Sequence, residues 1–196
     1  MKDFRGELIK YGKLIYAQNL VTGCGGNISV RVGSRVYIKA SGVSLENSTA
    51  ADYNEADLKT GKVFCRKGPC SVELPMHIAC YKARADIGAV IHTHPVYGTI
   101  LAMLIKKLGF VSYEFACALS TEVPVISYKK SGSRELANAV AGAIKKHNAV
   151  LLKNHGAIVV GKDLEEAYQR SVVLERSCKI YVLSKLAGKV SLIGQY

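Results

Sequence analysis

The sequence predicts an α/β domain in which helices cover a mixed, largely antiparallel sheet. Apolar runs of strand length and amphipathic stretches of helical length both occur, but they do not follow a strict strand–helix alternation. Only Gly33 and Ser34 separate the strand runs 28–32 and 35–40, which is typical of a β-hairpin and therefore of antiparallel neighbours. A length of 196 residues suits a single domain, residues 1–196, with a sizeable core.

A first helix is predicted to begin after Asp3 and to end near Asn19. Asp3 is a suitable N-cap, because its side chain can accept a hydrogen bond from the first turn. Apolar residues at helical spacing form one face of this segment: Phe4, Leu8, Tyr11, Leu14 and Ile15. A glycine-rich turn, 22–27, then leads into the hairpin.

The later elements follow from capping and periodicity signals. Pro75 suits the first turn of a helix, Ser133 suits an N-cap, and Glu166 stands three residues beyond Asp163 as in a capping box. Helices are predicted at 76–84, 97–107, 134–147 and from 163 to about 186. Strands are predicted at 54–58, 62–65, 88–94, 123–126, 149–153 and 157–160. The segment 110–119 is ambiguous and its state stays open.

The chain carries a net charge of +12, which can favour nucleic acid, an acidic membrane surface or an anionic small substrate. The basic residues are scattered, no block of five like charges occurs, and no nucleic-acid-binding motif is present. A solvated basic surface is therefore the simplest interpretation. Such a surface would also steer a phosphorylated substrate toward the protein.

The six cysteines do not form a Cys-x-x-Cys pair, and no segment approaches the length of a membrane span. The first residues lack the apolar core of a signal peptide. These features predict a cytoplasmic protein without a membrane partner, whose thiols are mostly reduced. Cys65 and Cys70 are near enough in sequence to suggest a disulfide, although a reducing compartment disfavours one.

The motif His92-Thr93-His94 is the main candidate for chemistry. It follows a buried apolar run, and residues i and i+2 of a strand point to the same face, so both imidazoles would lie on one side. Pro95 tends to end the strand there. His155 lies at the turn between two apolar strands and is a natural third ligand. Three histidines with an open position are typical of a catalytic zinc site, whereas structural histidines are the alternative.

Glu73 stands just before Leu74-Pro75, at the predicted start of a helix. A carboxylate there is favoured by the helix dipole, so Glu73 is a capping residue in the simplest interpretation. The functional alternatives are a general base beside the metal, which needs a raised pKa, or a labile fourth ligand.

Small residues mark two turns, 23–27 and 41–42, and Ser71 stands close to Glu73. Glycine backbone N–H groups together with Asn and Ser side chains can hold a phosphate. Taken singly these signals are weak, because ordinary turns use the same residues, and the glycine run matches neither a Walker loop nor a dinucleotide fingerprint.

Five short motifs follow one another along the chain: Gly-Gly-Asn-Ile-Ser at 25–29, Ser-Gly at 41–42, Ser-x-Glu-x-x-x-His at 71–77, His-Thr-His at 92–94 and Lys-Asn-His-Gly at 153–156. This order resembles the class II aldolase family, which includes L-fuculose-1-phosphate aldolase and L-ribulose-5-phosphate 4-epimerase. The resemblance extends from about Leu8 to about Leu186. It implies a three-layer α/β/α domain, a divalent metal, usually Zn²⁺, and a homotetramer with active sites at subunit interfaces.

The resemblance also implies roles for individual residues. The metal ligands would be His92, His94 and His155. Glu73 would be the acid/base residue, and Tyr113 would reach the active site of a neighbouring subunit. The substrate phosphate would be held by Gly26, Asn27, Ser41, Gly42 and Ser71. The epimerases of the family carry Asp where Glu73 stands, whereas the fuculose-phosphate aldolases carry Glu. In this respect the chain resembles the fuculose-phosphate aldolases.

Several positions depart from that branch. Cys24 stands in place of a hydroxyl residue, Val72 in place of a phosphate-site serine, and Ser131 in place of an active-site phenylalanine. The chain is also expected to lack the C-terminal helix that supplies a second tyrosine. These differences concern the phosphate site and the aldehyde side of the substrate.

The activity implied is zinc-dependent retro-aldol cleavage of a ketose 1-phosphate, such as L-fuculose 1-phosphate, to dihydroxyacetone phosphate and a short aldehyde. Two alternatives on the same scaffold are a sugar-phosphate 4-epimerase and a methylthioribulose-1-phosphate dehydratase, because the latter also keeps three His and a Glu. A non-catalytic interaction module of the adducin type is a third alternative, which the intact ligand set argues against. A nucleic-acid-binding protein has only the net charge in its favour.

Overall fold

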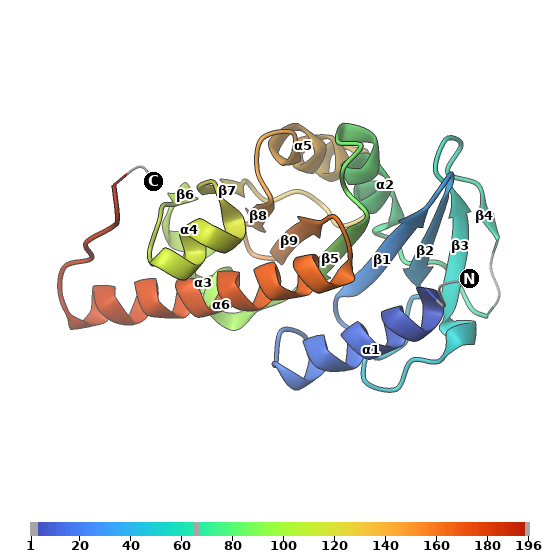
Figure 1. Cartoon of the computed structure of the whole chain (residues 1–196), viewed down its shortest axis with the longest axis horizontal. Coiled ribbons are helices and arrows are strands. Elements are labelled where there is room, and N and C mark those ends of the chain that lie inside the picture. Colours follow the sequence, from blue (N-terminus) through green and yellow to red (C-terminus); the bar gives the residue numbers. More distant parts are fainter. Residues whose placement is uncertain (1–3, 65–66, 195–196) are drawn as a thin grey trace.

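The computed structural model describes residues 4–64 and 67–194. Nine strands of this described part form one sheet in the order β4-β3-β2-β1-β5-β9-β8-β7-β6 (Figure 1). All neighbouring strands are antiparallel except β7 and β8, which are parallel. The prediction of a mixed, largely antiparallel sheet is confirmed.

The strands are short and the central ones are almost entirely buried. Their bounds are β1 Asn27–Val32, β2 Arg35–Lys39, β3 Tyr53–Asp57, β4 Val63–Phe64, β5 Ala89–Thr93, β6 Lys107–Leu108, β7 Val123–Ile126, β8 Ala149–Leu152 and β9 Gly156–Gly161. A 3₁₀ turn, Ala50–Asp52, precedes β3. Because β5, β8 and β9 are covered on both faces, they appear in the sequence as continuous apolar runs and not as alternating patterns.

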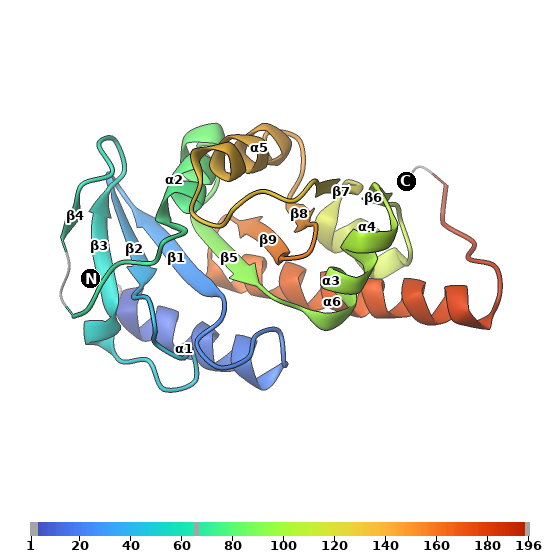
Figure 2. The same cartoon turned by 180° about the vertical axis from the view of Figure 1, so that it is seen from behind.

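Helices cover both faces of the sheet and make three layers, as Figures 1 and 2 show. Their bounds are α1 Phe4–Ala17, α2 Leu74–Ala83, α3 Val96–Leu104, α4 Tyr113–Leu119, α5 Arg134–Ile144 and α6 Leu164–Ala187. Helices α2 and α5 pack together on one face, and α1, α3, α4 and α6 lie on the other. The predicted three-layer α/β/α arrangement is confirmed.

Buried aliphatic side chains hold the layers together in three clusters. The first lies between the sheet and α2 and α5, and includes Ile78, Val140 and Ile158. The second lies under α1 and the first part of α6, and the third lies under α3, α4 and the middle of α6. Full burial of one such side chain contributes about 1.5–3 kcal/mol, so these clusters supply the main stabilisation of the fold.

The register of the three central strands positions the predicted histidines. Asn27 of β1 pairs with His92 of β5, and Ile158 of β9 pairs with His92 from the other side. The beginning of β1, the end of β5 and the beginning of β9 therefore meet at one edge of the sheet. The turns that precede β1 and β9 lie at this same edge, together with the segment that follows β5.

Two segments differ from, or add to, what the sequence predicted. The helix predicted at 97–107 ends at Leu104, and Lys107–Leu108 instead form β6 against β7. Pairing satisfies backbone groups of β7 that would otherwise remain unpaired, which is a tertiary effect that local helix propensity does not contain. The ambiguous segment 110–119 contains α4, which Ser112 caps by accepting a hydrogen bond from the Phe115 N–H.

Two predictions concern residues outside the described part: Asp3 as the first helix cap, and Cys65 as a strand end and disulfide partner. Within the residues that the structure describes, no helix combines the length and the apolar character needed to cross a lipid bilayer.

Two glycines, one beside the start of β5 and one in α5, test how strongly the fold depends on close backbone packing at each position. A methyl group at Gly88 would collide with the Lys162 carbonyl oxygen, where the start of β5 meets the end of β9. We expect Gly88→Ala to destabilise the protein by about 1–3 kcal/mol, the range for overpacking. Gly142 lies in α5 with open space around its Cα, so Gly142→Ala should stabilise by about 1 kcal/mol. Urea unfolding of both variants measures this contrast, and equal effects would contradict it.

Candidate metal centre and active site

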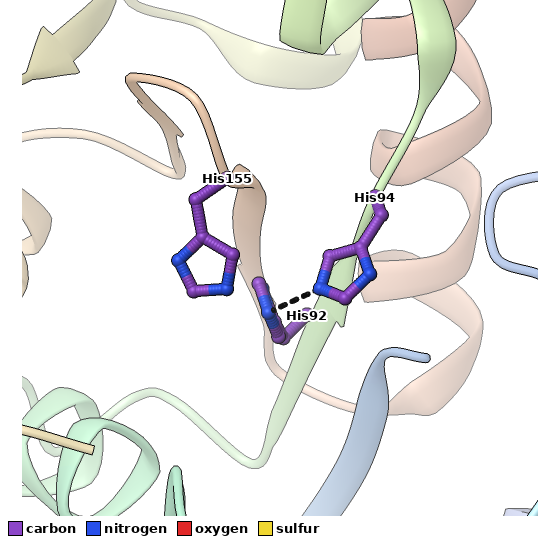
Figure 3. A group of neighbouring side chains, drawn as sticks. All are labelled: His92, His94 and His155. Atoms are coloured by element: carbon purple, nitrogen blue, oxygen red, sulfur yellow. Dashed lines mark hydrogen bonds between the residues drawn. The ribbon is translucent and has the colours of Figure 1, made fainter. Parts of the chain in front are cut away.

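Three histidines lie together at the edge of the sheet where β1, β5 and β9 meet (Figure 3). His92 is in β5, His94 follows two residues later, and His155 is in the turn between β8 and β9. One ring nitrogen of each lies within 4.8 Å of the corresponding nitrogens of the others. The structure therefore brings together the three residues that the sequence predicted as metal ligands.

The local backbone explains why these rings converge. Asn154 has a φ of 57°, so the tight turn between β8 and β9 points His155 back toward β5. A methyl group at Gly156 would collide with the Thr93 carbonyl oxygen, so only glycine lets the two chain segments approach this closely. The His94 N–H donates to the Leu20 carbonyl at 2.9 Å, which anchors the end of the motif.

Glu73 lies directly beside the three histidines. Its position at the N-cap of α2 agrees with the sequence prediction, but its side chain makes no capping hydrogen bond to the helix. Instead Oε2 lies 2.8 Å from His92 Nε2, and Oε1 lies 3.5 Å from His155 Nε2. Ser131 Oγ donates to Oε1 at 2.8 Å and Asn27 Nδ2 donates to Oε2 at 3.2 Å. The capping interpretation of Glu73 therefore does not account for its side chain.

The contacts of His92 fit a positive ion between these groups. His92 Nδ1 lies 2.9 Å from the Ala157 carbonyl oxygen, which can only accept, so a neutral ring carries its proton on Nδ1. Nε2 then presents a lone pair to the Glu73 carboxylate at 2.8 Å, and this contact needs positive charge. His94 Nε2 lies 3.0 Å from the same atom. Imidazole nitrogens converging next to a carboxylate are a suitable donor set for a divalent metal ion.

Burial favours the neutral, metal-binding form of two of the three imidazoles, His94 and His155. Burial lowers the pKa of His94 to about 4, and the neighbouring His92 and His155 act in the same direction. Burial also lowers the pKa of His155, again with His92 contributing. Neutral rings leave the ring nitrogens available as ligands at neutral pH.

The pKa of Glu73 follows from two opposing effects. Burial would raise it, since the residue is only 4% exposed. Positive charge at the His92 and His155 positions, whether on a ring proton or on a bound metal ion, combines with the Ser131 hydrogen bond to outweigh burial and hold the pKa of Glu73 below its ordinary value. The expectation of a raised pKa is therefore wrong for this arrangement, although an ionised carboxylate is the form that a general base requires.

A cavity of about 190 Å³ opens beside the histidines and Glu73. All five residues predicted for the phosphate line it: Gly26, Asn27, Ser41, Gly42 and Ser71. Gly26 and Asn27 lie where the glycine-rich turn enters β1, Ser41 and Gly42 follow β2, and Ser71 precedes α2. The amide Nδ2 of Asn27 donates to Glu73, so its side chain supports the carboxylate. The structure thus brings the five predicted phosphate-site residues together at one cavity, and one of them, Asn27, also supports the Glu73 carboxylate.

Lys39 is a residue of this cavity that the sequence prediction missed. It is 2% exposed, and its Nζ donates to the carbonyl oxygens of Cys24 at 3.1 Å and Val43 at 2.5 Å. Burial lowers the pKa of Lys39, and Cys24 partly opposes this. The available signal was a charged residue inside an apolar strand, immediately before the 41–42 turn. The departures Cys24, Val72 and Ser131 also line the cavity.

The sequence matches the family described as Class II Aldolase and Adducin N-terminal domain over residues 6–182. The chain belongs to this family. The resemblance predicted from the five motifs is therefore confirmed, and the metal-dependent chemistry of class II aldolases agrees with the three-histidine site.

Individual relatives agree with an aldolase. The chain is 38% identical to an L-fuculose phosphate aldolase of Methanococcus maripaludis over 181 residues, which cover 92% of this chain and 97% of that protein. It is 34% identical to a 5-deoxy-D-ribulose 1-phosphate aldolase of Bacillus thuringiensis serovar kurstaki over 193 residues, 97% of this chain and 90% of that protein. A solved L-fuculose 1-phosphate aldolase superposes with a TM-score of 0.93 at 34% identity, covering 99% of this chain and 92% of that one. The protein is a class II aldolase, a lyase.

Tyr113 lies away from the aldolase site of its own chain. It is the first residue of α4, is 63% exposed, and does not line the cavity. Figures 1 and 2 place α4 beside β6 and β7, at the opposite end of the sheet from β2 and β3. An exposed position is what a residue that serves a neighbouring subunit requires, and this role of Tyr113 stays a prediction.

The metal site can be tested by removing one ligand. We expect about one divalent ion per chain, and His155→Ala should lose it because two imidazoles rarely hold such an ion. His147→Ala is the matched control, since His147 bonds the Glu122 carbonyl at 2.8 Å outside the site. Elemental analysis after dialysis measures both variants. Full metal content in His155→Ala would remove that residue from the ligand set.

Proposed function

We propose that this protein is a zinc-dependent aldolase that cleaves a ketose 1-phosphate, similar to L-fuculose 1-phosphate, into dihydroxyacetone phosphate and a short aldehyde. The observation that carries the proposal is the Glu73 carboxylate placed against His92 and His155 in the wall of one cavity. The proposal includes a single domain, residues 1–196, that acts in the cytoplasm on a phosphorylated sugar and does not bind nucleic acid.

The cradle of small residues supports a phosphorylated substrate. Gly26 and Gly42 have φ values of 67° and 74°, and such turns can turn backbone N–H groups toward an anion. The Ser71 hydroxyl accepts a hydrogen bond from the Glu73 N–H at 3.3 Å, so its own proton remains available for a phosphate oxygen. The buried ammonium group of Lys39 in the cavity wall adds a positive charge.

The donor set supports zinc, with His92, His94 and His155 as ligands and an open position for substrate. When bound, the ion acts as a Lewis acid that stabilises negative charge on the substrate carbonyl oxygen. The chain itself orients the His92 ring through its bond with the Ala157 carbonyl.

Glu73 is assigned the proton transfer at C3. In the cleavage direction the C4 hydroxyl loses its proton, the C3–C4 bond breaks to release the aldehyde, and C3 then gains a proton to give dihydroxyacetone phosphate. In the synthesis direction the ionised Glu73 removes the C3 proton, and its two bonds from Ser131 and Asn27 hold it in place meanwhile. Tyr113 of a neighbouring subunit would handle the proton on the aldehyde oxygen.

A product assay tests the reaction. Zinc-loaded protein is incubated with several ketose 1-phosphates, including L-fuculose 1-phosphate and 5-deoxyribulose 1-phosphate. We expect dihydroxyacetone phosphate from at least one of them, detected by a coupled reduction. A 4-epimerase would instead convert a pentulose 5-phosphate to its epimer without releasing dihydroxyacetone phosphate. A dehydratase would release water from methylthioribulose 1-phosphate and leave its carbon chain intact. Either result would replace the aldolase proposal.

In the same assay, Glu73→Gln should lower activity by roughly 10²–10⁴ while bound metal is retained, because the shape is kept and the proton carrier is lost. Exchange of the C3 proton of dihydroxyacetone phosphate with solvent should fall equally, since this step needs no aldehyde. Asp52→Asn is the control for loss of a buried carboxylate outside the site. Exchange at the parental rate in Glu73→Gln would place the base elsewhere.

We also propose a homotetramer in which Tyr113 serves a neighbouring site. Light scattering should then give four times the subunit mass. Tyr113→Phe and His155→Ala should each be inactive alone, but chains co-expressed and co-purified should regain activity, because hybrid assemblies combine an intact metal site with an intact tyrosine. A monomeric mass with full activity, or no recovery in hybrids, would contradict this arrangement.

A further inference from the structure

A row of buried polar side chains lies between α2 and β1, whereas the apolar residues Ile28 and Val30 of β1 face the opposite side of the sheet. We call the row the polar seam: Asn27 and Ser29 from β1, and Glu73, His77 and Tyr81 at the start and along α2. All five are buried, with exposed fractions between 0% and 6%. The other buried residues of α2, such as Met76 and Cys80, pack in the apolar cluster between the sheet and α5.

Both β1 members of the polar seam contact polar residues of the helix segment. Asn27 Nδ2 donates to Glu73 Oε2 at 3.2 Å. Ser29 Oγ lies 2.7 Å from His77 Nδ1 and 2.7 Å from the Tyr81 hydroxyl. Ser29 therefore joins two successive turns of α2 to one position on the strand. His77 Nε2 has no hydrogen-bond partner in the described part of the chain, so Ser29 is the bonding partner that holds this ring.

The repeat lengths of helix and strand explain why these contacts form one row. Glu73, His77 and Tyr81 are spaced by four residues, which advance a helix by about 6 Å per step. Asn27 and Ser29 are spaced by two residues, which advance a strand by about 6.6 Å. The two periods nearly match, so polar groups meet along the contact. Sliding α2 along β1 by one turn would move each polar side chain against a different partner.

Such a row fixes the position of α2 along β1 more than it stabilises the folded protein. An apolar set of similar volume would pack between the same elements without desolvating polar atoms. Buried polar groups instead disfavour every arrangement in which they lose their partners, at a cost of about 1–3 kcal/mol for each unsatisfied group. The polar seam therefore selects one register of α2 on β1. Burial lowers the pKa of His77 to about 3, so the ring is neutral and acts here as a hydrogen-bonding group.

The seam ends at the metal centre. Asn27 is the register partner of His92 across the β1–β5 pair, and it is also the residue that donates to Glu73. The register of α2 on β1 therefore decides how far the Glu73 carboxylate lies from His92. The hydrogen bonds between Ser29 and His77 and between Ser29 and Tyr81 are the contacts that set this register.

We propose that Ser29 and His77 are positioning residues that hold Glu73 at its distance from the metal ligands, through the register of α2 on β1. The inference rests on the proposed role of Glu73 as proton carrier. Displacement of a catalytic group by about 1 Å can lower a rate by roughly 10²-fold, so loss of the seam should affect turnover more than substrate binding.

Ser29→Ala is the first test, because it removes both bonds of Ser29 and leaves every residue of the cavity in place. Ser48→Ala is its matched control: Ser48 is also buried and bonds a buried tyrosine, Tyr53, at 3.0 Å, but on the side of the sheet that packs against α1. We expect Ser29→Ala to lower kcat by about 10-fold, within the range that misplacement allows, with KM and metal content retained. Ser48→Ala should keep the parental kcat although its melting temperature falls comparably.

A double-mutant cycle separates positioning from general damage. If Ser29 acts through Glu73, then Ser29→Ala should cause no further loss of the residual activity of Glu73→Gln. An equal loss in both backgrounds, or a parental kcat in Ser29→Ala, would overturn the inference. If Ser29→Ala does not fold, Tyr81→Phe replaces it in the same cycle, because it removes one hydroxyl and keeps the packing of the ring, with Tyr53→Phe as its control.

The same data distinguish the two proposals. Parental proton exchange in Glu73→Gln would overturn both the role of Glu73 and the positioning role that depends on it. Strong loss in Glu73→Gln, combined with independent effects of Ser29→Ala, would overturn the positioning inference alone and leave the proposed function standing.

Discussion

The antiparallel pairing of β5 with β1 on one side and β9 on the other is the constraint on which the site depends. It places Asn27, His92 and Ile158 in one line across the sheet, and it leaves the segment after β5 and the turn before β9 facing each other. Gly156, at the start of β9, has no side chain and can therefore lie close to the Thr93 carbonyl at the end of β5. A shift of one residue in either pairing would turn His92 to the other face of the sheet and separate the three imidazoles.

Charge balance is the second constraint, because the site concentrates ionisable groups where water is largely excluded. Burial lowers the pKa values of His94 and His155, while the histidines and Ser131 keep Glu73 ionised. Lys39 lies in the same cavity wall with its ammonium group bonded to two carbonyl oxygens. The cavity therefore combines neutral ligands, one fixed negative charge and one buried positive charge, which suits a metal ion and an anionic substrate together.

Three departures from the fuculose-phosphate branch, Cys24, Val72 and Ser131, lie in the cavity wall, and the three histidines are unchanged. Val72 is 64% exposed and presents an apolar surface where the resemblance implies a serine. Ser131 donates to Glu73 where the resemblance implies a phenylalanine, so a hydroxyl that supports the carboxylate takes the place of a large ring. Gly132 packs against the backbone of Val72, which joins both positions into one wall. This wall is where selectivity among phosphorylated sugars would arise.

The sequence by itself determined the layered α/β class, the hairpin, most helices and most of the residues that meet at the site. These features depend on local signals: apolar periodicity, caps, glycine turns and short motifs with characteristic spacing. Only the tertiary structure decided that Lys107–Leu108 pair with β7, that Asn27 supports Glu73, and that Lys39 lines the cavity. It also reversed the expected direction of the Glu73 pKa. Each of these depends on groups far apart in the chain, whose distances and desolvation arise only when the sheet and helices pack together.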